Sequence, residues 1–249
     1  MLSVQGVAKS FGGIRAVDGC SLKIEKSAIV GLIGPNGAGK TTLFKIISGF
    51  EKPDTGTIIY KGENVVDITC FEIARRGLIR TFQLTKALTK LTVEENMMLA
   101  PQFQHGERIW NVWLRSKEVK RQEDENRAKA ISLLEFFGLL PLKDEYAGAL
   151  SGGQKRLLEI ARALMAEPKM LLLDEPFAGV NPSLSKKLLK HIQDLRDKTG
   201  MTFLVIEHDM HIIMQLSDFI YVLNKGKVIA SGAPEEVQND NRVLDAYLG

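Results

Sequence analysis

One stretch of the sequence decides the fold: Gly34-Pro35-Asn36-Gly37-Ala38-Gly39-Lys40-Thr41. It matches the phosphate-loop pattern G-x4-G-K-[ST] at every fixed position. The apolar run at 28–33 before it indicates a strand buried on both faces, and residues 42–48 after it indicate a helix that ends at Gly49. A glycine loop between a buried strand and a helix is the context that this motif requires, so the sequence predicts an α/β fold.

The residue types in this loop suit a nucleoside triphosphate bound with Mg²⁺. Glycines let backbone N–H groups converge on phosphate oxygens, and the amino end of the following helix adds a positive partial charge. Lys40 supplies a full positive charge, and the hydroxyl of Thr41 is a ligand for Mg²⁺. We therefore expect ATP and Mg²⁺ as cofactors and include Thr42 in the nucleotide site. The alternative is a glycine-rich turn that carries Lys-Thr by chance.

A second candidate site follows the apolar run at 170–173, where Asp174 and Glu175 come in succession. Asp174 at the end of a buried strand is placed to hold Mg²⁺ through its waters. We expect Glu175 to point elsewhere because side chains alternate along a strand, and a carboxylate there can polarise an attacking water. The alternative is an acidic pair that caps the next segment before Pro176.

The rest of the chain alternates between strand and helix signals, which favours an α/β sheet. From about Phe71 to Glu167 helical signals dominate, with a helix start at Thr92 and a long charged helix over 117–137 that ends at Gly138. We interpret this part as a helical insertion. Strands are expected at 4–7, 21–24, 57–60 and 202–206, helices at 182–198 and 210–216, and a hairpin at 219–223 and 227–231.

Composition narrows the classes of function. The 249 residues are 45% hydrophobic, and 33 basic against 30 acidic side chains give a net charge of +3, too even to predict nucleic-acid binding. Cys20 and Cys70 form no metal-binding pattern. No secretory signal is expected, and no apolar run approaches the ~20 residues that a membrane span needs.

Four further motifs resemble those of ATP-binding cassette (ABC) ATPases, in the order found in that family. The stretch Leu150-Ser151-Gly152-Gly153-Gln154 before a helix resembles the family signature. Gln83, after Arg80-Thr81-Phe82, resembles the Q-loop glutamine. Residues 178–182 resemble the D-loop, and His208 resembles the switch histidine. The resemblance covers essentially the whole chain.

The resemblance implies a reaction in which two cassettes face head to tail and share each ATP. Ser151 and Gly153 would offer donors to the γ-phosphate of the other subunit's ATP. His208 would contact the γ-phosphate and orient Glu175 or the water, and Gln83 would sense Mg²⁺. The implied catalytic residues are Glu175, His208, Lys40 and Gln83. The implied Mg²⁺ ligands are Thr41, Gln83 and Asp174. The remaining nucleotide contacts are Phe11 (against adenine), residues 34–42, Ser151, Gly152, Gly153 and Gln154.

The resemblance also implies the architecture. We expect a single ABC ATPase domain with a P-loop NTPase core and an N-terminal antiparallel β subdomain. These parts would comprise 1–82 and 168–249. A helical subdomain with the Q-loop and the signature motif would occupy 83–167.

Within the family, the sequence looks most like the ATPases of branched-chain amino acid importers. Asn181 stands where many members carry Asp in the D-loop, and Arg80-Thr81-Phe82-Gln83 and the tail from Gly232 to Gly249 are similar to that group. The implied partners are transmembrane permease subunits, a second ABC ATPase subunit in a homodimer or paralogous heterodimer, and a solute-binding protein. The implied location is cytoplasmic, peripheral on the inner face of the cell membrane.

Several alternatives stay open at this point. Within transport, these are a lipopolysaccharide-type exporter ATPase and a urea or amide importer. Outside transport, one alternative is an ABC ATPase that acts on ribosomes or DNA. The other is a small-molecule P-loop kinase, although such a kinase would not need the signature at 150–154. Trp110 and Trp113 lie on one face of an expected helix, where they either pack within the insertion or contact a permease or lipid headgroups.

Overall fold

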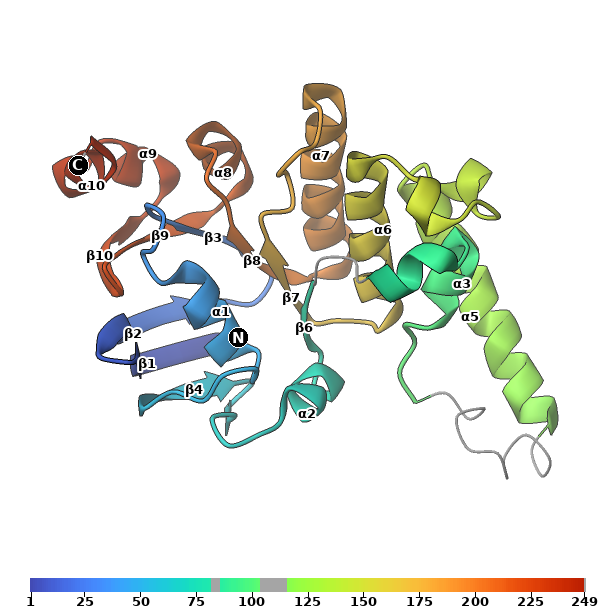
Figure 1. Ribbon diagram of the computed structural model, residues 1–249, viewed down its shortest axis with the longest axis horizontal. Helices are drawn as coiled ribbons and strands as arrows, with labels where there is room; N and C mark the ends of the chain where they lie inside the picture. Colours follow the sequence, from blue (N-terminus) through green and yellow to red (C-terminus); the bar gives the residue numbers. More distant parts are fainter. Residues whose placement is uncertain (82–85, 104–115, 249) are drawn as a thin grey trace. The chain divides into compact units, whose positions relative to one another are not determined.

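The computed structural model describes residues 1–81, 86–103 and 116–248 (Figure 1). Gln83, Trp110 and Trp113 lie outside the described residues. The chain divides into two compact units. The first unit comprises Met1–Arg80, Lys169–Ala178 and Lys186–Gly249, and the second comprises Thr81–Pro168 and Gly179–Ser185.

The first unit contains a largely parallel sheet with strand order β10-β9-β3-β8-β7-β6 (Figure 1). Its strands are β3 (Ile29–Ile33), β6 (Leu78–Arg80), β7 (Met170–Asp174), β8 (Thr202–Ile206), β9 (Phe219–Asn224) and β10 (Lys227–Gly232). Every residue of β3 and β8 is buried, as expected of central strands covered on both faces. The parallel pairing of β7 with β8 and of β8 with β3 brings the carboxyl ends of these strands to one edge. Ligands of open α/β sheets bind at this edge.

A second sheet in the same unit is antiparallel, with order β2-β1-β4-β5. Its strands are β1 (Leu2–Phe11), β2 (Ile14–Ile24), β4 (Thr55–Tyr60) and β5 (Glu63–Asn64). Strands β1 and β2 are longer than the expected 4–7 and 21–24 because register shifts interrupt their pairing and break the alternation of apolar side chains. The predicted antiparallel β subdomain is therefore confirmed.

Helices of the first unit follow the strands closely. They are α1 (Lys40–Ile47), α2 (Cys70–Arg75), α8 (Met210–Leu216), α9 (Pro234–Gln238) and α10 (Asn241–Leu248). Helix α1 begins two residues before the expected 42–48, directly at the end of the glycine loop. Helix α8 has the predicted bounds and packs on β3, where a Cβ added to Gly31 would lie 2.8 Å from Cγ1 of Ile213.

The described part of the second unit is helical. It contains 3-10 turns at Lys86–Lys90, Leu140–Leu142 and Ala147–Ala149 and the helices α3 (Val93–Met98), α5 (Ser116–Phe136) and α6 (Gly152–Met165). Thr92 caps α3, as predicted, because its hydroxyl accepts from the backbone of Glu95 while the Glu95 carboxylate accepts from the backbone of Thr92. Helix α7 (Pro182–Thr199) starts within the second unit's 179–185 segment.

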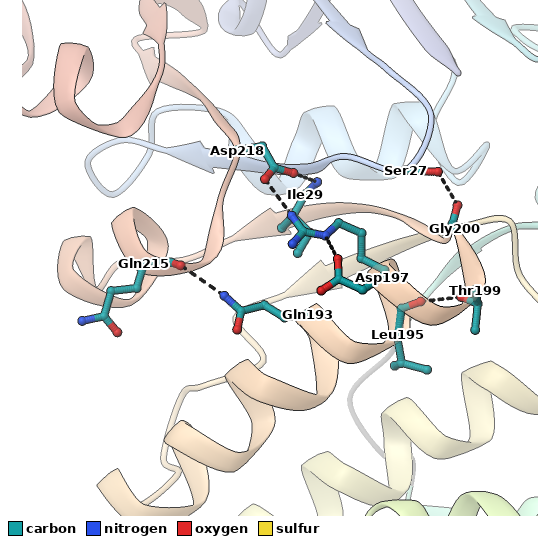
Figure 2. A network of polar contacts seen from close by, with 10 residues as sticks. Ser27, Ile29, Gln193, Leu195, Asp197, Thr199, Gly200, Gln215 and Asp218 are labelled. Carbon is teal, nitrogen blue, oxygen red and sulfur yellow. Dashed lines mark hydrogen bonds and ion pairs between the residues drawn. The ribbon is translucent and has the colours of Figure 1, made fainter.

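A polar network ties the amino ends of β3 and β9 to the carboxyl end of α7 (Figure 2). Asp218 accepts from the backbone N–H of Ile29 at 2.8 Å and from the guanidinium of Arg196 at 2.7 Å. Ser27 donates its hydroxyl to the carbonyl of Gly200 at 3.0 Å. These contacts lie at the edge of the sheet opposite to the glycine loop, so they stabilise the unit without reaching that loop.

Candidate functional site

The glycine loop after β3 has a backbone that only glycine tolerates at two positions. Gly34 has φ 146° and Gly39 has φ 100°. A Cβ on Gly34 would overlap the carbonyl oxygen of Leu223, and one on Gly39 would overlap the carbonyl oxygen of Ala16. The loop is therefore packed closely against Ala16 in β2 and Leu223 in β9.

The β9–β10 hairpin braces the loop directly. The backbone N–H of Gly226 donates to the carbonyl of Ala38 at 3.0 Å, and the carbonyl of Gly226 accepts from the N–H of Asp18 at 2.9 Å. Lys227 adds an ion pair with Asp18 at 3.2 Å. The predicted hairpin around 224–226 thus has a second role, because it holds the middle of the loop in place.

The amino end of α1 is open to an anion. Its N-cap residue, Gly39, has no side chain to accept from the first-turn N–H groups, and the first turn contains no acidic residue. Uncapped N–H groups and the helix dipole favour phosphate at this position. Thr41 is exposed and Thr42 half-buried in the same turn. The loop and α1 together fit a polyphosphate, as the sequence predicts.

Lys40 is held inside the loop. Its ammonium donates to the carbonyls of Gly34 at 2.7 Å and Pro35 at 3.0 Å, and only 6% of the residue is exposed. Burial lowers the pKa of Lys40 below its ordinary value, and the nearby carboxylates of Glu175 and Asp174 oppose that shift. The structure thus brings the predicted cation and both predicted carboxylates into one electrostatic cluster.

Asp174, the last residue of β7, is paired with a residue that the sequence analysis did not include in the site. The guanidinium of Arg80, at the end of the neighbouring β6, lies 2.8 Å from a carboxylate oxygen of Asp174. The same guanidinium lies over the ring of Phe44 at 5.9 Å. Asp174 is therefore charge-compensated in this structure.

The protein supplies few ligands for a cation here. Among the described residues, no group of three His, Cys, Asp or Glu side chains lies together in a way that could hold a metal ion. Thr41 and Asp174 offer a hydroxyl and a carboxylate, which are oxygen ligands of the kind that Mg²⁺ prefers. This donor set fits Mg²⁺ that arrives with phosphate oxygens and waters, and not a metal held by the protein alone.

Glu175 and His208 meet after the ends of β7 and β8. The Nε2 atom of His208 lies 2.6 Å from Oε1 of Glu175, and both side chains are partly exposed. The prediction that alternation along the strand orients Glu175 is wrong. Strand β7 ends at Asp174, and Glu175 has φ 52° in the left-handed region. A backbone turn, not alternation along a strand, separates the two carboxylates. This conformation is uncommon for a residue other than glycine and marks a constrained position.

Glu207 is a further residue that the sequence analysis missed. It directly precedes His208, only 4% of it is exposed, and its carboxylate accepts from the backbone N–H groups of Phe177 at 2.9 Å and His208 at 3.2 Å. Burial raises the pKa of Glu207 above its ordinary value, while these two hydrogen bonds oppose the shift. An acidic residue at the end of a fully buried strand was the signal that could have found it.

The signature residues form the start of α6 in the second unit. Ser151 is the N-cap: its hydroxyl accepts from the N–H of Gln154 at 3.3 Å, and its own N–H donates to the Gln154 side chain at 2.8 Å. Ser151 and Gly152 are exposed, whereas Gly153 is buried, and a Cβ on it would overlap the side chain of Leu184. The signature therefore presents an exposed helix amino end.

Asn181 has a local role in the same unit. Its side-chain oxygen accepts from the N–H of Leu184 at 2.9 Å, so Asn181 caps the start of α7. Either Asn or Asp can perform this capping. The departure from the common family residue therefore leaves the local helix start intact.

Phe11 and Tyr247 are two partly exposed aromatic residues of the first unit. Phe11, at the end of β1, is 46% exposed, and the ammonium of Lys9 lies 5.4 Å from its ring centre. Burial raises the pKa of Tyr247 in α10, and a hydrogen bond from the backbone of Gly34 opposes that shift. The C-terminal helix thus contacts the first residue of the loop, a contact that the sequence alone did not indicate.

A glycine loop between the buried strand β3 and an uncapped helix, with carboxylates at the end of β7 in the same sheet, defines a P-loop nucleotide-binding protein. The chain belongs to the family described as ABC transporter, and the match to this family spans residues 17–178. A second family, described as branched-chain amino acid ATP-binding cassette transporter, matches residues 227–249. The predicted resemblance to ABC ATPases and the predicted P-loop fold class are confirmed.

Individual relatives match over the full length. The chain is 42% identical to a probable branched-chain amino acid transport ATP-binding protein LivG of Archaeoglobus fulgidus, covering 100% of this chain and 95% of the relative. It is 41% identical to the high-affinity LivG protein of Escherichia coli strain K12, with coverage of 100% and 98%. An ABC transporter cassette solved in its ADP conformation superposes with a TM-score of 0.87 at 38% identity, with coverage of 100% and 98%. A bacterial ABC transporter cassette solved as a dimer gives a TM-score of 0.77 at 25% identity, with coverage of 94% and 99%.

Proposed function

We propose that this chain is the ATP-hydrolysing subunit of a membrane importer for branched-chain or related amino acids. The observation that carries the catalytic part is the contact of 2.6 Å between Glu175 and His208 beside the phosphate loop. The solute class rests on the full-length similarity to LivG proteins and on the matching tail at 227–249. ATP hydrolysis would drive a conformational change in a permease, and no substrate would be phosphorylated.

The residues of the first unit divide the chemical work. The loop at 34–42 binds the phosphates through backbone N–H groups, and Lys40 moves from its loop carbonyls to phosphate oxygens. Phe11 stacks on adenine with its exposed ring face. Glu175 accepts a hydrogen bond from the attacking water, and His208 holds Glu175 in place and contacts the γ-phosphate.

Thr41, Asp174 and Gln83 would hold Mg²⁺ in the nucleotide complex. The ion would supply positive charge there, which would offset the negative charge that develops during phosphoryl transfer. The guanidinium of Arg80 contacts Oδ2 of Asp174, so Arg80 and the waters of Mg²⁺ would share this carboxylate.

A second cassette would complete the site. The exposed amino end of α6, with Ser151, Gly152, Gly153 and Gln154, would donate to the γ-phosphate of ATP bound to the other subunit. The other subunit is either a second copy of this chain or a paralogous cassette.

Membrane partners would transmit the motion. Across the ranges 1–81, 86–103 and 116–248, no helix combines the length and the apolar character that crossing a bilayer requires. We propose permease subunits as the membrane-spanning partners, with Gln83 linking the nucleotide to them, and a solute-binding protein that delivers the solute. The chain would lie on the cytoplasmic face of the membrane, and no nucleic acid takes part.

The test is transport in vesicles that contain the chain together with the permeases encoded beside it. We expect ATP-dependent uptake of leucine, isoleucine or valine, and loss of both uptake and phosphate release in Glu175→Gln. Uptake of urea or an amide instead would move the chain to a different importer, and outward movement of lipopolysaccharide would make it an exporter subunit. Recovery of a phosphorylated solute would refute the ATPase assignment.

A further inference from the structure

Glu207 is a buried carboxylate to which the reaction above assigns no role. Its side chain is placed after β8 and is almost completely excluded from solvent. Burying a carboxylate costs free energy unless its oxygens are hydrogen-bonded, so such a residue needs a reason to be there. Here each oxygen has its own donor: Oε1 accepts from the N–H of Phe177, and Oε2 accepts from the N–H of His208.

These two donors belong to the two segments that carry the reacting pair. Phe177 lies two residues after Glu175, on the segment that follows β7, and His208 follows β8. The side chains of Glu175 and His208 meet at 2.6 Å. Glu207 therefore closes a ring of contacts, in which one carboxylate bridges the backbones and one hydrogen bond joins the side chains.

We propose that Glu207 is a positioning residue for ATP hydrolysis, because its two oxygens fix the segment of Glu175 relative to the backbone of His208. The inference rests on the proposed function of this site. Glu207 itself touches neither nucleotide nor water in this role. Its effect passes through the orientation of Glu175 and His208.

The conformation of Glu175 explains why such a bridge is needed. A residue at φ 52° keeps a less favourable backbone only when its surroundings hold it there. Its N–H donates to the carbonyl of Ile206 at 3.0 Å, and two residues later the N–H of Phe177 is held by Glu207. The turn that points Glu175 at His208 is thus anchored on both sides to the end of β8.

A carboxylate suits this task and an amide does not. Two N–H donors require two acceptor oxygens, and the side chain of glutamine offers one oxygen and one NH₂ group. Glu207→Gln keeps the volume but leaves one buried N–H facing another donor. The substitution should loosen one of the two segments without opening a cavity.

The experiment compares Glu207→Gln with wild type in the full-length chain. We expect the kcat of ATP hydrolysis to fall by roughly tenfold or more, because small displacements of reacting groups lower the rate strongly. The KM and the affinity for a fluorescent ATP analogue should stay within about twofold, since the loop at 34–42 is intact. A kcat within about twofold of wild type would overturn the inference.

Asp218→Asn is the matched control for general destabilisation. Asp218 also accepts from a backbone N–H and from a second donor, but at the opposite edge of the same sheet. We expect this variant to lower the melting temperature and to leave kcat within about twofold. If both variants lowered kcat in proportion to their loss of stability, Glu207 would be structural only.

Two further measurements separate this inference from the proposed function. In a His208→Ala background, Glu207→Gln should lower kcat by a smaller factor than in wild type, because part of its effect passes through the missing pair. An equal factor in both backgrounds would contradict the inference. The ring-nitrogen NMR signals of His208 should shift in Glu207→Gln and not in Asp218→Asn, a readout that needs no hydrolysis. An unchanged His208 signal would refute the positioning role, whereas absence of ATP hydrolysis in wild type would refute only the proposed function.

Discussion

Lys40 illustrates how individual side chains of the site are prepared for a ligand. Its ammonium is buried and rests on two carbonyls of its own loop, so the positive charge is already at the place where phosphates would bind. Lys40→Ala should weaken binding of a fluorescent ATP analogue by roughly a hundredfold, about 3 kcal/mol, because charge-assisted contacts are lost. Lys45→Ala, on the exposed face of the same helix α1, is the control and should bind normally. Normal affinity in Lys40→Ala would contradict the loop assignment.

Arg80 tests the electrostatics at the end of β7. Both side chains of the Arg80–Asp174 pair are largely buried, with 10% and 22% exposed, so removal of the guanidinium leaves a carboxylate without its cation. Arg80→Gln should lower the free energy of unfolding by about 1–3 kcal/mol. Addition of Mg²⁺ to the ADP complex should then raise the melting temperature more in Arg80→Gln than in wild type, since the ion can neutralise Asp174. Equal Mg²⁺ effects in the two proteins would show that Asp174 does not bind the ion.

At the scale of elements, the start of α6 has a capping role and a proposed role in hydrolysis, and two variants separate them. Ser151→Ala removes the N-cap and should cost about 1 kcal/mol of stability. It should also impair hydrolysis, while ATP binding to a monomer stays nearly normal because the hydroxyl acts on the other subunit's nucleotide. Thr92→Ala removes a capping box of the same kind from α3 and should cost similar stability with hydrolysis preserved. Equal loss of hydrolysis in both variants would mean that Ser151 is only a cap.

The β9–β10 turn supports the phosphate loop through packing and a backbone hydrogen bond, and it contributes no reacting group. Gly226 has φ 80°, and a Cβ there would lie 3.1 Å from the Cα of Val17 in β2, the strand that packs on the loop. Gly226→Ala should therefore weaken ATP binding as well as lower stability, as measured by titration and thermal unfolding. Gly62→Ala is the matched control, because Gly62 has φ 88° in another hairpin and open space around its Cα. It should lower stability by a similar amount, roughly 1–2 kcal/mol, and leave ATP binding unchanged.

At the scale of the whole molecule, local pattern and long-range contact divide what sequence can predict. The loop at 34–41, the buried strands and the helix start at Thr92 depend on neighbours within a few residues, so the sequence predicts them well. The partner of Asp174 is Arg80, 94 positions away in the chain, and this pairing exists only because β6 lies next to β7. The bridge from Glu207 to Phe177 depends on tertiary structure in the same way. No spacing rule connects such residues, so their roles emerge only from the fold.

The proposed sharing of each ATP between two cassettes leads to a prediction about assembly. Neither the loop at 34–41 nor the amino end of α6 provides donors on every side of a γ-phosphate, so ATP should bring two cassettes together. We expect Glu175→Gln to elute as a dimer in light-scattering chromatography with MgATP, because it binds nucleotide without hydrolysing it, and as a monomer with ADP. Lys40→Ala should remain monomeric with either nucleotide. If Glu175→Gln were monomeric with MgATP and became dimeric only after addition of a paralogous cassette, the native pair would be a heterodimer. Failure to associate in both cases would contradict the shared site itself.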